Sequence, residues 1–299
     1  MTMTMPDYID VPEHIPDVHF KKSVQAESGL DIVTLEDIYD HESMDHDPSR
    51  PHRVGFHCLL YIEGGLGQHF IDFNAYDLVQ GHCVFIHKHQ VHAFDFDNRP
   101  QGLLLLFTDA FIDTIRTNIS TDLFSPLHFM DGYSPIVNLN GELNVRFQRV
   151  LIELMTEHQD LKCDPLMLQL LFSCLILKLD KQREQGVSTQ LRPEQIRRFN
   201  HFMTLLERDY RMSKNATDYA AQLSTSYKSL NLLCKQACQK TAKQIIDDHV
   251  ILQAKRKLVT SQSHIQTLAF ELGFDEVGNF VKYFKKHAGM TPVQFRKTH

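Results

Sequence analysis

One arrangement of residues occurs twice in the last third of the chain and restricts that part to a helical fold. In the second copy, residues 265–272 place apolar side chains on one helix face, and Gly273 ends the helix because glycine readily takes the left-handed cap conformation. Asp275 is the expected N-cap of a second helix. Phe280 and Phe284 lie four residues apart in that helix, so both should pack against the first helix.

The first copy has the same layout. Its packing helix carries apolar or small residues on one face: Tyr219, Ala220 and Leu223. Residues 224–226 are small and hydroxylated, which predicts the turn and the cap of the next helix. Leu230 and Cys234 then repeat the four-residue spacing of the two phenylalanines. We therefore expect two helix-turn-helix units, at 217–238 and 265–288.

A helix-turn-helix unit seats its second helix in the major groove of DNA. A helix predicted at 242–259 would hold the two units so that their second helices enter successive grooves, roughly 34 Å apart. Asparagine can pair with adenine, and lysine can reach guanine or phosphate. From the outward register, the base-proximal candidates are Lys228, Asn231, Leu232, Gly278, Asn279 and Lys282. The phosphate candidates are Lys235, Lys285, Lys286 and Arg296. A solvated helix face is the alternative reading of the lysines.

The charge distribution favours DNA binding. Residues 190–299 hold 18 lysines and arginines against 9 acidic residues, whereas residues 1–189 hold 13 against 28. The net charge of −6 for the whole chain therefore conceals a basic last third behind an acidic front part. Such asymmetry points to nucleic acid or another anionic surface as the partner of the basic part.

Residues 53–108 show the short alternating pattern of a small β-barrel or sandwich. The segment that ends at Gly64-Gly65 predicts a β-hairpin, and turns are expected at Asn74-Ala75 and Gln80-Gly81. Residues 102–107 are typical of a buried strand. Aromatic and aliphatic residues are ample for a packed core.

Helical periodicity follows at 144–179, with Pro165 at the first position of the second helix. Two adjacent amphipathic helices need a partner surface, which is either the barrel or a second subunit. Residues 1–52 are acidic and proline-punctuated, which predicts a loose lead-in with one strand near 30–38. The polar segment at 186–195 is the best linker candidate.

Residues 217–297 resemble the DNA-binding domain of the AraC/XylS family of bacterial transcription regulators. The stretches that carry the resemblance are "AKRKL", "IQTLAFELGF" and "GMTPVQFR". The chain departs from the family at Gln239, where glycine is usual, and at Cys234, where an aromatic residue is common. Leu232 falls where a long polar or basic residue is frequent, so we expect it to contact a thymine methyl group.

The resemblance implies an α+β chain of two domains. A cupin-like β-barrel with a helical dimerisation segment would occupy 53–185, and an all-α DNA-binding domain would occupy 196–299. It also implies a sequence-specific activator that is controlled by a small effector in the barrel and dimerises through 144–179. Its partners would be promoter DNA and RNA polymerase, at the nucleoid in the bacterial cytoplasm. The expected effector pocket comprises His57, Leu59, Tyr61, Phe85, His92, Phe94 and Phe96.

Two alternatives stay open. In metal-dependent cupin enzymes an H-x-H pair binds iron, manganese or zinc, and here His87 and His89 form such a pair, with His92 nearby. No carboxylate stands at the enzyme spacing, since Phe94 occupies it, so no cofactor, metal site or catalytic residue is expected. The other alternative is a regulator without a ligand. The scattered cysteines and the lack of a signal-peptide pattern are typical of a cytosolic protein.

Overall fold

The computed structural model describes residues 15–20, 28–40, 45–119, 135–160, 162–186 and 191–298. These residues form two compact units. The first contains the described residues up to 186, and the second contains residues 191–298. The boundary between the units falls inside the linker predicted at 186–195.

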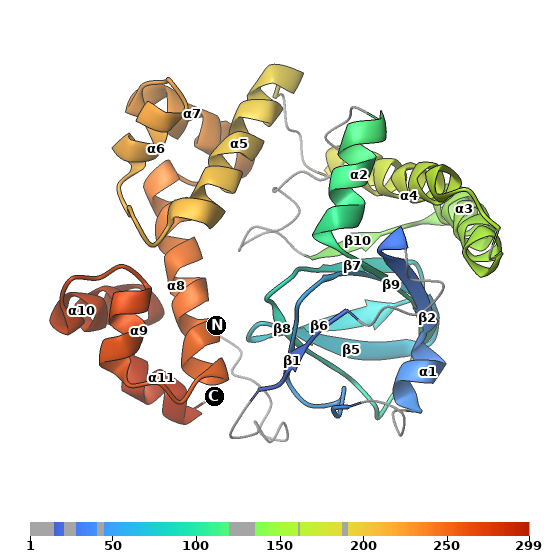
Figure 1. Ribbon diagram of the computed structural model, residues 1–299, viewed down its shortest axis with the longest axis horizontal. Coiled ribbons are helices and arrows are strands. Elements are labelled where there is room, and N and C mark those ends of the chain that lie inside the picture. The colour runs from blue at the N-terminus through green and yellow to red at the C-terminus, as the bar shows by residue number, and fades with distance from the viewer. Residues whose placement is uncertain are drawn as a thin grey trace. The chain divides into compact units, whose positions relative to one another are not determined.

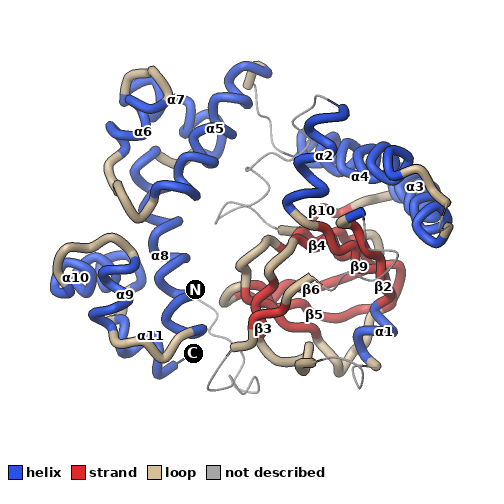
Figure 2. Tube along the Cα trace, viewed as in Figure 1, coloured by secondary structure: helices blue, strands red, loops and turns tan. Residues whose placement is uncertain are grey.

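The first unit is built on two five-stranded sheets, which face each other without closing into one barrel (Figures 1 and 2). One sheet has the order β1-β3-β8-β5-β6, and its strands are Asp17–Val18, His52–Val54, Val91–Phe94, Leu66–Ile71 and Asn74–Val79. The other has the order β10-β7-β4-β9-β2, and its strands are Ile136–Asn138, His82–Ile86, His57–Gly64, Gln101–Phe107 and Leu30–Thr34. The cupin-like sheet domain is therefore present as a two-sheet sandwich.

Two turn predictions for this sandwich are wrong, the hairpin at Gly64-Gly65 and the turn at Asn74-Ala75, which are the first two residues of strand β6. Gly64-Gly65 does not close a hairpin, because β4 and β5 belong to different sheets and the glycines mark the crossing between them. The hairpin that does form joins β5 to β6, where Ile71 pairs with Asn74 and Asp72 takes a positive φ of 44°. Glycine takes a positive φ without steric cost both in a hairpin turn and in a crossing between sheets, so the sequence alone does not distinguish these two connections.

The strand predicted near 30–38 is confirmed as β2, Leu30–Thr34, but this part of the chain is not a loose lead-in. Strand β2 pairs antiparallel along all of its length with β9, from Leu30 opposite Phe107 to Thr34 opposite Leu103. Helix α1, Leu35–Tyr39, follows it behind a capping box made by Thr34 and Asp37. This segment is therefore part of the sandwich.

Three helices accompany the second sheet: α2, Asp109–Ile119, α3, Gly141–Gln159, and α4, Pro165–Gly186 (Figure 1). Phe172 of α4 packs on Phe107 of β9 and on Phe111 of α2, with ring centroids 4.9 and 5.3 Å apart. Tyr61 of β4 packs on Phe147 of α3 at 5.2 Å. Because side chains alternate along a strand, one face of this sheet packs on helices and the other on the first sheet.

The second unit is entirely helical among its described residues. Its helices are α5, Pro193–Asp209, α6, Ala216–Gln222, α7, Tyr227–Cys238, α8, Ala242–Thr260, α9, Ile265–Glu271, α10, Val277–Ala288, and α11, Pro292–Thr298. Within this unit α8 runs through the middle, with α6 and α7 at one end and α9 to α11 at the other (Figure 1). Phe280 and Phe284 are fully buried, as the helical spacing predicted.

The two helix-turn-helix units are copies that differ in their turns. Residues 223–226 join α6 to α7, whereas 272–276 join α9 to α10. The extra residue places Glu276, without a side-chain cap, at the start of α10. Asp275 is therefore not the N-cap that the sequence predicted. The first turn does have its expected cap, because the Ser226 side chain accepts from the Ser229 N–H at 3.1 Å.

Both second helices end on a residue in the left-handed conformation. Gly289 after α10 has a φ of 78°, and Gln239 after α7 has a φ of 59°. A residue with a Cβ is strained in this conformation, so the first helix-turn-helix unit carries a backbone strain at Gln239 that the second avoids with Gly289.

We predict that Gln239→Gly raises the free energy of unfolding by about 1 kcal/mol, because the left-handed conformation costs a Cβ-bearing residue about 1–2 kcal/mol and the entropy of unfolded glycine offsets part of the gain. Calorimetry of the full chain measures this as a higher unfolding temperature of the helical part, residues 191–298. Gly289→Ala is the matched control, since a Cβ there meets no atom within 4 Å and only the backbone strain acts. It should lower the same unfolding temperature, and a neutral Gln239→Gly would contradict the assignment.

Candidate nucleic-acid interface and effector cavity

Helices α7 and α10 present exposed faces of one charge sign. Lys228, Leu232 and Lys235 are exposed on α7. The exposed predicted residues of α10 are Gly278, Asn279, Lys282, Lys285 and Lys286. Neither helix contains an acidic residue. The faces opposite the buried core therefore offer cationic and amide groups to solvent, as a DNA-reading helix requires.

Two of the predicted DNA contacts have structural partners instead. The Asn231 side-chain oxygen accepts from the Ala242 N–H at 3.1 Å, so it caps the start of α8. The Arg296 guanidinium donates to the Leu258 carbonyl at 3.1 Å and to the Ser263 carbonyl at 2.8 Å, which closes the end of α8. These bonds favour a structural role for both side chains over direct DNA contact.

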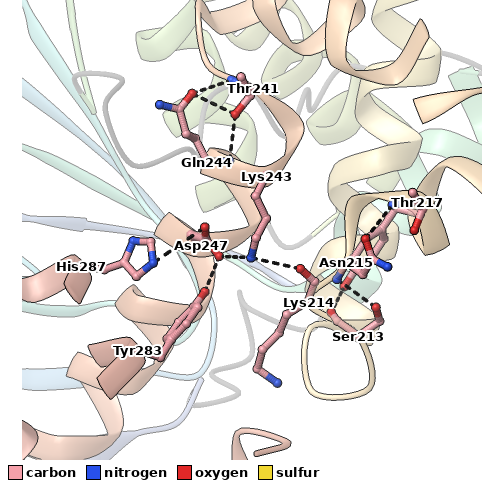
Figure 3. Close-up of polar contacts among 11 residues, drawn as sticks. Ser213, Lys214, Asn215, Thr217, Thr241, Lys243, Gln244, Asp247, Tyr283 and His287 are labelled. Atoms are coloured by element: carbon pink, nitrogen blue, oxygen red, sulfur yellow. Dashed lines mark hydrogen bonds and ion pairs between the residues drawn. The ribbon is translucent and has the colours of Figure 1, made fainter. Parts of the chain in front are cut away.

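A buried carboxylate joins α10 to α8. Asp247 of α8 is 7% exposed, and its Oδ1 accepts a 2.5 Å hydrogen bond from the Tyr283 hydroxyl of α10 (Figure 3). Lys243, one turn earlier on α8, donates to the same oxygen. His287 lies 3.8 Å from the second oxygen. Burial and the bond to Asp247 raise the pKa of the Tyr283 hydroxyl, so it stays protonated and donates. We call these four residues the Asp247 junction.

The junction continues into the first helix-turn-helix unit. Lys243 Nζ also donates to the Lys214 carbonyl at 3.2 Å, in the loop before α6 (Figure 3). Lys214 Nζ in turn donates to the Gly273 carbonyl at 2.9 Å and lies 4.3 Å from the centroid of the Phe274 ring. The loop and the second turn approach so closely that a Cβ on Gly273 would lie 1.7 Å from the Arg211 carbonyl oxygen. The two helix-turn-helix units are therefore bonded to each other as well as to α8.

A cavity of about 360 Å³ lies between the two sheets of the first unit. Its wall is mostly apolar and includes Val54, Phe56, Phe94 and Leu104. Two buried histidines, His52 and His92, contribute imidazoles, with ring centroids 4.2 Å apart. The size and the mostly apolar surface are those of a small-molecule site.

Only His92 and Phe94 of the predicted effector residues line this cavity. Leu59, Tyr61 and Phe85 do not line it, so this cavity does not support their assignment to an effector pocket. The Tyr61 hydroxyl donates to Asn144 of α3 at 2.8 Å, which places this face of β4 against the helices. Cys58 and Leu60, on the opposite face of β4, belong to the apolar cluster between the sheets, because successive residues of a strand point to opposite faces.

His57 and Phe96 also lie outside the cavity. His57 Nε2 is 2.9 Å from Asp109 Oδ1, and the Lys88 ammonium is 2.6 Å from the other oxygen of that carboxylate. The hydrogen bonds to His57, which contributes most, and to Lys88 hold the pKa of the Asp109 carboxyl well below its usual range. Phe96 packs edge-on to Tyr39 at 5.2 Å.

The sequence reasoning missed the wall that comes from the predicted lead-in. Asp17, Val18, Phe20 and Asp31 all line the cavity. The strand pattern that begins at Leu30 is the sequence feature that could have identified Asp31 as part of this wall. Among the described residues, no group of three or more histidine, cysteine, aspartate or glutamate side chains is placed to hold a metal ion.

Comparison with known proteins agrees with both units. The family model for a helix-turn-helix domain matches residues 219–298, and the model for an AraC-like ligand binding domain matches 36–171. The chain belongs to the AraC/XylS family. It is therefore a transcription regulator that binds DNA through its second unit and carries an AraC-like ligand-binding domain as its first unit.

Individual relatives of this AraC/XylS regulator are distant. The transcriptional activator RhaS of Escherichia coli O1:K1 is 23% identical over 253 residues, which cover 82% of this chain and 87% of the relative. RhaS of Klebsiella pneumoniae is 21% identical over 252 residues, with the same coverage. Fatty-acid-bound ToxT of Vibrio cholerae is 16% identical, with a TM-score of 0.44 over 82% of this chain and 87% of that structure. None of the described helices is long and apolar enough to cross a membrane.

We predict that Tyr283→Phe lowers the free energy of unfolding by about 1–3 kcal/mol, because the buried Asp247 carboxylate loses a donor. Tyr227→Phe is the control, since the Tyr227 side chain at the start of α7 is 45% exposed and its loss should stay within about 0.5 kcal/mol. Urea unfolding followed by far-ultraviolet circular dichroism compares the two variants. Equal effects of the two substitutions would show that the Asp247 junction does not stabilise the fold.

Proposed function

We propose that this regulator lays α7 and α10 in two successive major grooves of promoter DNA. The observation that carries the proposal is the pair of exposed faces without acidic residues on two helices that are both bonded to α8, α7 through Asn231 and α10 through the Asp247 junction. A fixed separation of two reading helices selects half-sites one helical turn apart, roughly 34 Å. The basic balance of residues 190–299 supplies the salt-dependent part of the affinity.

Within this proposal the exposed residues divide by role. Lys228, Leu232, Gly278, Asn279 and Lys282 are the base-proximal positions. Lys235, Lys285 and Lys286 lie further along their helices and are the phosphate contacts. Asn231 and Arg296 act first through the helix ends that they cap.

Lys285→Ala and Asn279→Ala should have different signatures in DNA binding. Loss of Lys285 should weaken all sequences together and reduce the slope of log K against log salt by about 1. Loss of Asn279 should relax one base position, by about 1–3 kcal/mol of discrimination, and leave the slope unchanged. Fluorescence anisotropy with a promoter fragment found by genome-wide mapping of bound sites measures both.

Lys162→Ala is the control for charge alone, because this exposed lysine lies between α3 and α4 in the first unit. It should change neither the affinity nor the slope. If Asn279→Ala leaves a binding-site selection unchanged, its base-proximal role is lost.

The surface of α3 and α4 supports a homodimer. Helix α4 buries one side, with Phe172, Leu175 and Ile176 inaccessible to solvent. A second apolar stripe on the same helix is exposed: Leu166, Leu170 and Leu177. On α3, Ile152 is 61% exposed. A helix that is apolar on opposite sides needs a second partner, and another copy of the chain supplies one.

We predict that Leu170→Glu with Leu177→Glu converts the protein to a monomer, because charges in an apolar interface are left unpaired. Sedimentation velocity at micromolar concentration measures the change in mass. Lys162→Glu is the control, since it adds an acidic group outside the stripe. A wild-type protein that sediments as a monomer would contradict the dimer.

Small-molecule control of transcription completes the proposal. An effector in the cavity can regulate only if it binds one arrangement of the two units better than another. The RhaS relatives are named as activators, and on that likeness we propose activation through RNA polymerase. The test is promoter-dependent transcription with purified polymerase, in which a repressor would lower the output.

A further inference from the structure

The cavity contains a hydrogen-bond acceptor whose tautomer the structure fixes. His52 Nδ1 lies 3.0 Å from the Arg50 carbonyl oxygen. A carbonyl only accepts, so Nδ1 carries the proton and donates. In the neutral imidazole Nε2 then has a lone pair and accepts. His52 lines the cavity and is only 3% exposed, so this acceptor is on a ring that is largely removed from water.

Buried imidazoles surround this acceptor. His69 Nε2 and His92 Nδ1 are 3.1 Å apart, so one of the two rings donates to the other. Burial lowers the pKa of His52 to about 4 and that of His69 to about 3, and lowers that of His92 well below its ordinary value. All three rings are therefore neutral at physiological pH. His92 Nε2 is buried and has no hydrogen-bond partner in the described part of the chain.

The charges at the cavity disfavour an anion. None of the described residues that line it is a lysine or arginine. Its charged side chains are acidic: Asp17, Asp31 and Asp45. A carboxylate ligand would face these groups with no lysine or arginine in the described wall, and the buried imidazoles of His52 and His92 are neutral.

The same charges do not select a cation. Asp17 is already paired with Arg53, whose guanidinium donates to both carboxylate oxygens. Asp31 Oδ1 accepts from the Ile32 N–H at 2.9 Å and lies 3.6 Å from His158 Nε2. An ammonium ion would therefore lose its hydration shell and meet carboxylates that already have partners.

We propose that the cavity binds an uncharged, mostly apolar alcohol or phenol, whose hydroxyl donates to His52 Nε2. The apolar part of such a ligand matches Val54, Phe56, Phe94 and Leu104. A hydroxyl has one hydrogen, so once it donates to His52 its oxygen can only accept, which fits the His92 tautomer that carries its proton on Nε2. In that tautomer His92 Nδ1 accepts from His69 Nε2, 3.1 Å away. This assignment rests on the proposed effector control and narrows it to a chemical class.

Isothermal titration calorimetry on the full chain without DNA tests the class with four probes of equal apolar length. They are para-hexylphenol, hexylbenzene, para-hexylbenzoate and para-hexylbenzylamine. We expect para-hexylphenol to bind about tenfold more tightly than each of the others, as one buried hydrogen bond allows. Equal or tighter binding of the benzoate or the benzylamine, or no binding of the phenol, would overturn the proposal.

Substitution of His52 tests the acceptor. His52→Phe keeps an aromatic ring beside His92 but removes Nε2, so hexylbenzene and para-hexylphenol should bind within about twofold of each other. His52→Gln returns an amide oxygen and should restore part of the preference, which also covers the case in which the phenylalanine variant does not fold. His57→Phe removes an imidazole outside the cavity and should keep the full preference. A preference that survives both His52 substitutions excludes His52 as the partner.

A separate measurement distinguishes this inference from the proposed function. Promoter affinity is measured with and without saturating para-hexylphenol. If the phenol binds with the expected preference but leaves promoter affinity and transcription unchanged, the ligand class is correct and effector control by this class is wrong. If the benzoate binds and changes promoter affinity, effector control is correct and the ligand class is wrong.

Discussion

The arrangement of the two helix-turn-helix units depends on one buried carboxylate. Asp247 is removed from water inside a helical unit, and an unpaired charge there would cost several kcal/mol. Its partners come from α8 itself and from α10, so satisfying the charge also fixes the angle between these helices. Lys243 extends the bonding to the loop before α6, and Gly273 permits the close contact of that loop with the second turn. These bonds join α10 and the loop before α6 to the same helix, α8, which is the arrangement that the proposed half-site spacing needs.

In the sandwich, the alternation of side chains along each strand decides which residues line the cavity. Each strand of the second sheet has one face toward helices and one toward the first sheet, so the parity of a residue decides whether it can line the cavity. Cys58 and Leu60 of β4 belong to the apolar cluster between the sheets, whereas Tyr61 bonds to α3. The histidines of β3 and β8 lie directly opposite each other, with His52 paired to His92, and this pairing brings the imidazoles together.

The sequence predicted those features that depend on local periodicity. The spacing of Phe280 and Phe284 identified the buried face of α10, and Pro165 marked the first residue of α4. It failed where distant segments decide the outcome. The pairing of β2 with β9 makes residues 30–34 part of the sandwich, which the local sequence around them did not predict. The two faces of β4 could not be told apart from the sequence, because nearly every residue of this strand is buried. Asp247 carried no signal, because its partner Tyr283 lies thirty-six residues away.

The two sites of this regulator use polar groups in opposite ways. On α7 and α10 the lysines stay in water, where their attraction to phosphate is long-ranged, weakened by salt and little dependent on sequence. In the cavity the polar groups are buried and uncharged, so a hydrogen bond there discriminates between ligands that differ by one hydroxyl. A buried acceptor rejects a ligand without a donor because the acceptor is left unpaired after water is displaced. Selectivity for a small neutral molecule therefore requires what the DNA surface avoids, which is the removal of polar atoms from solvent.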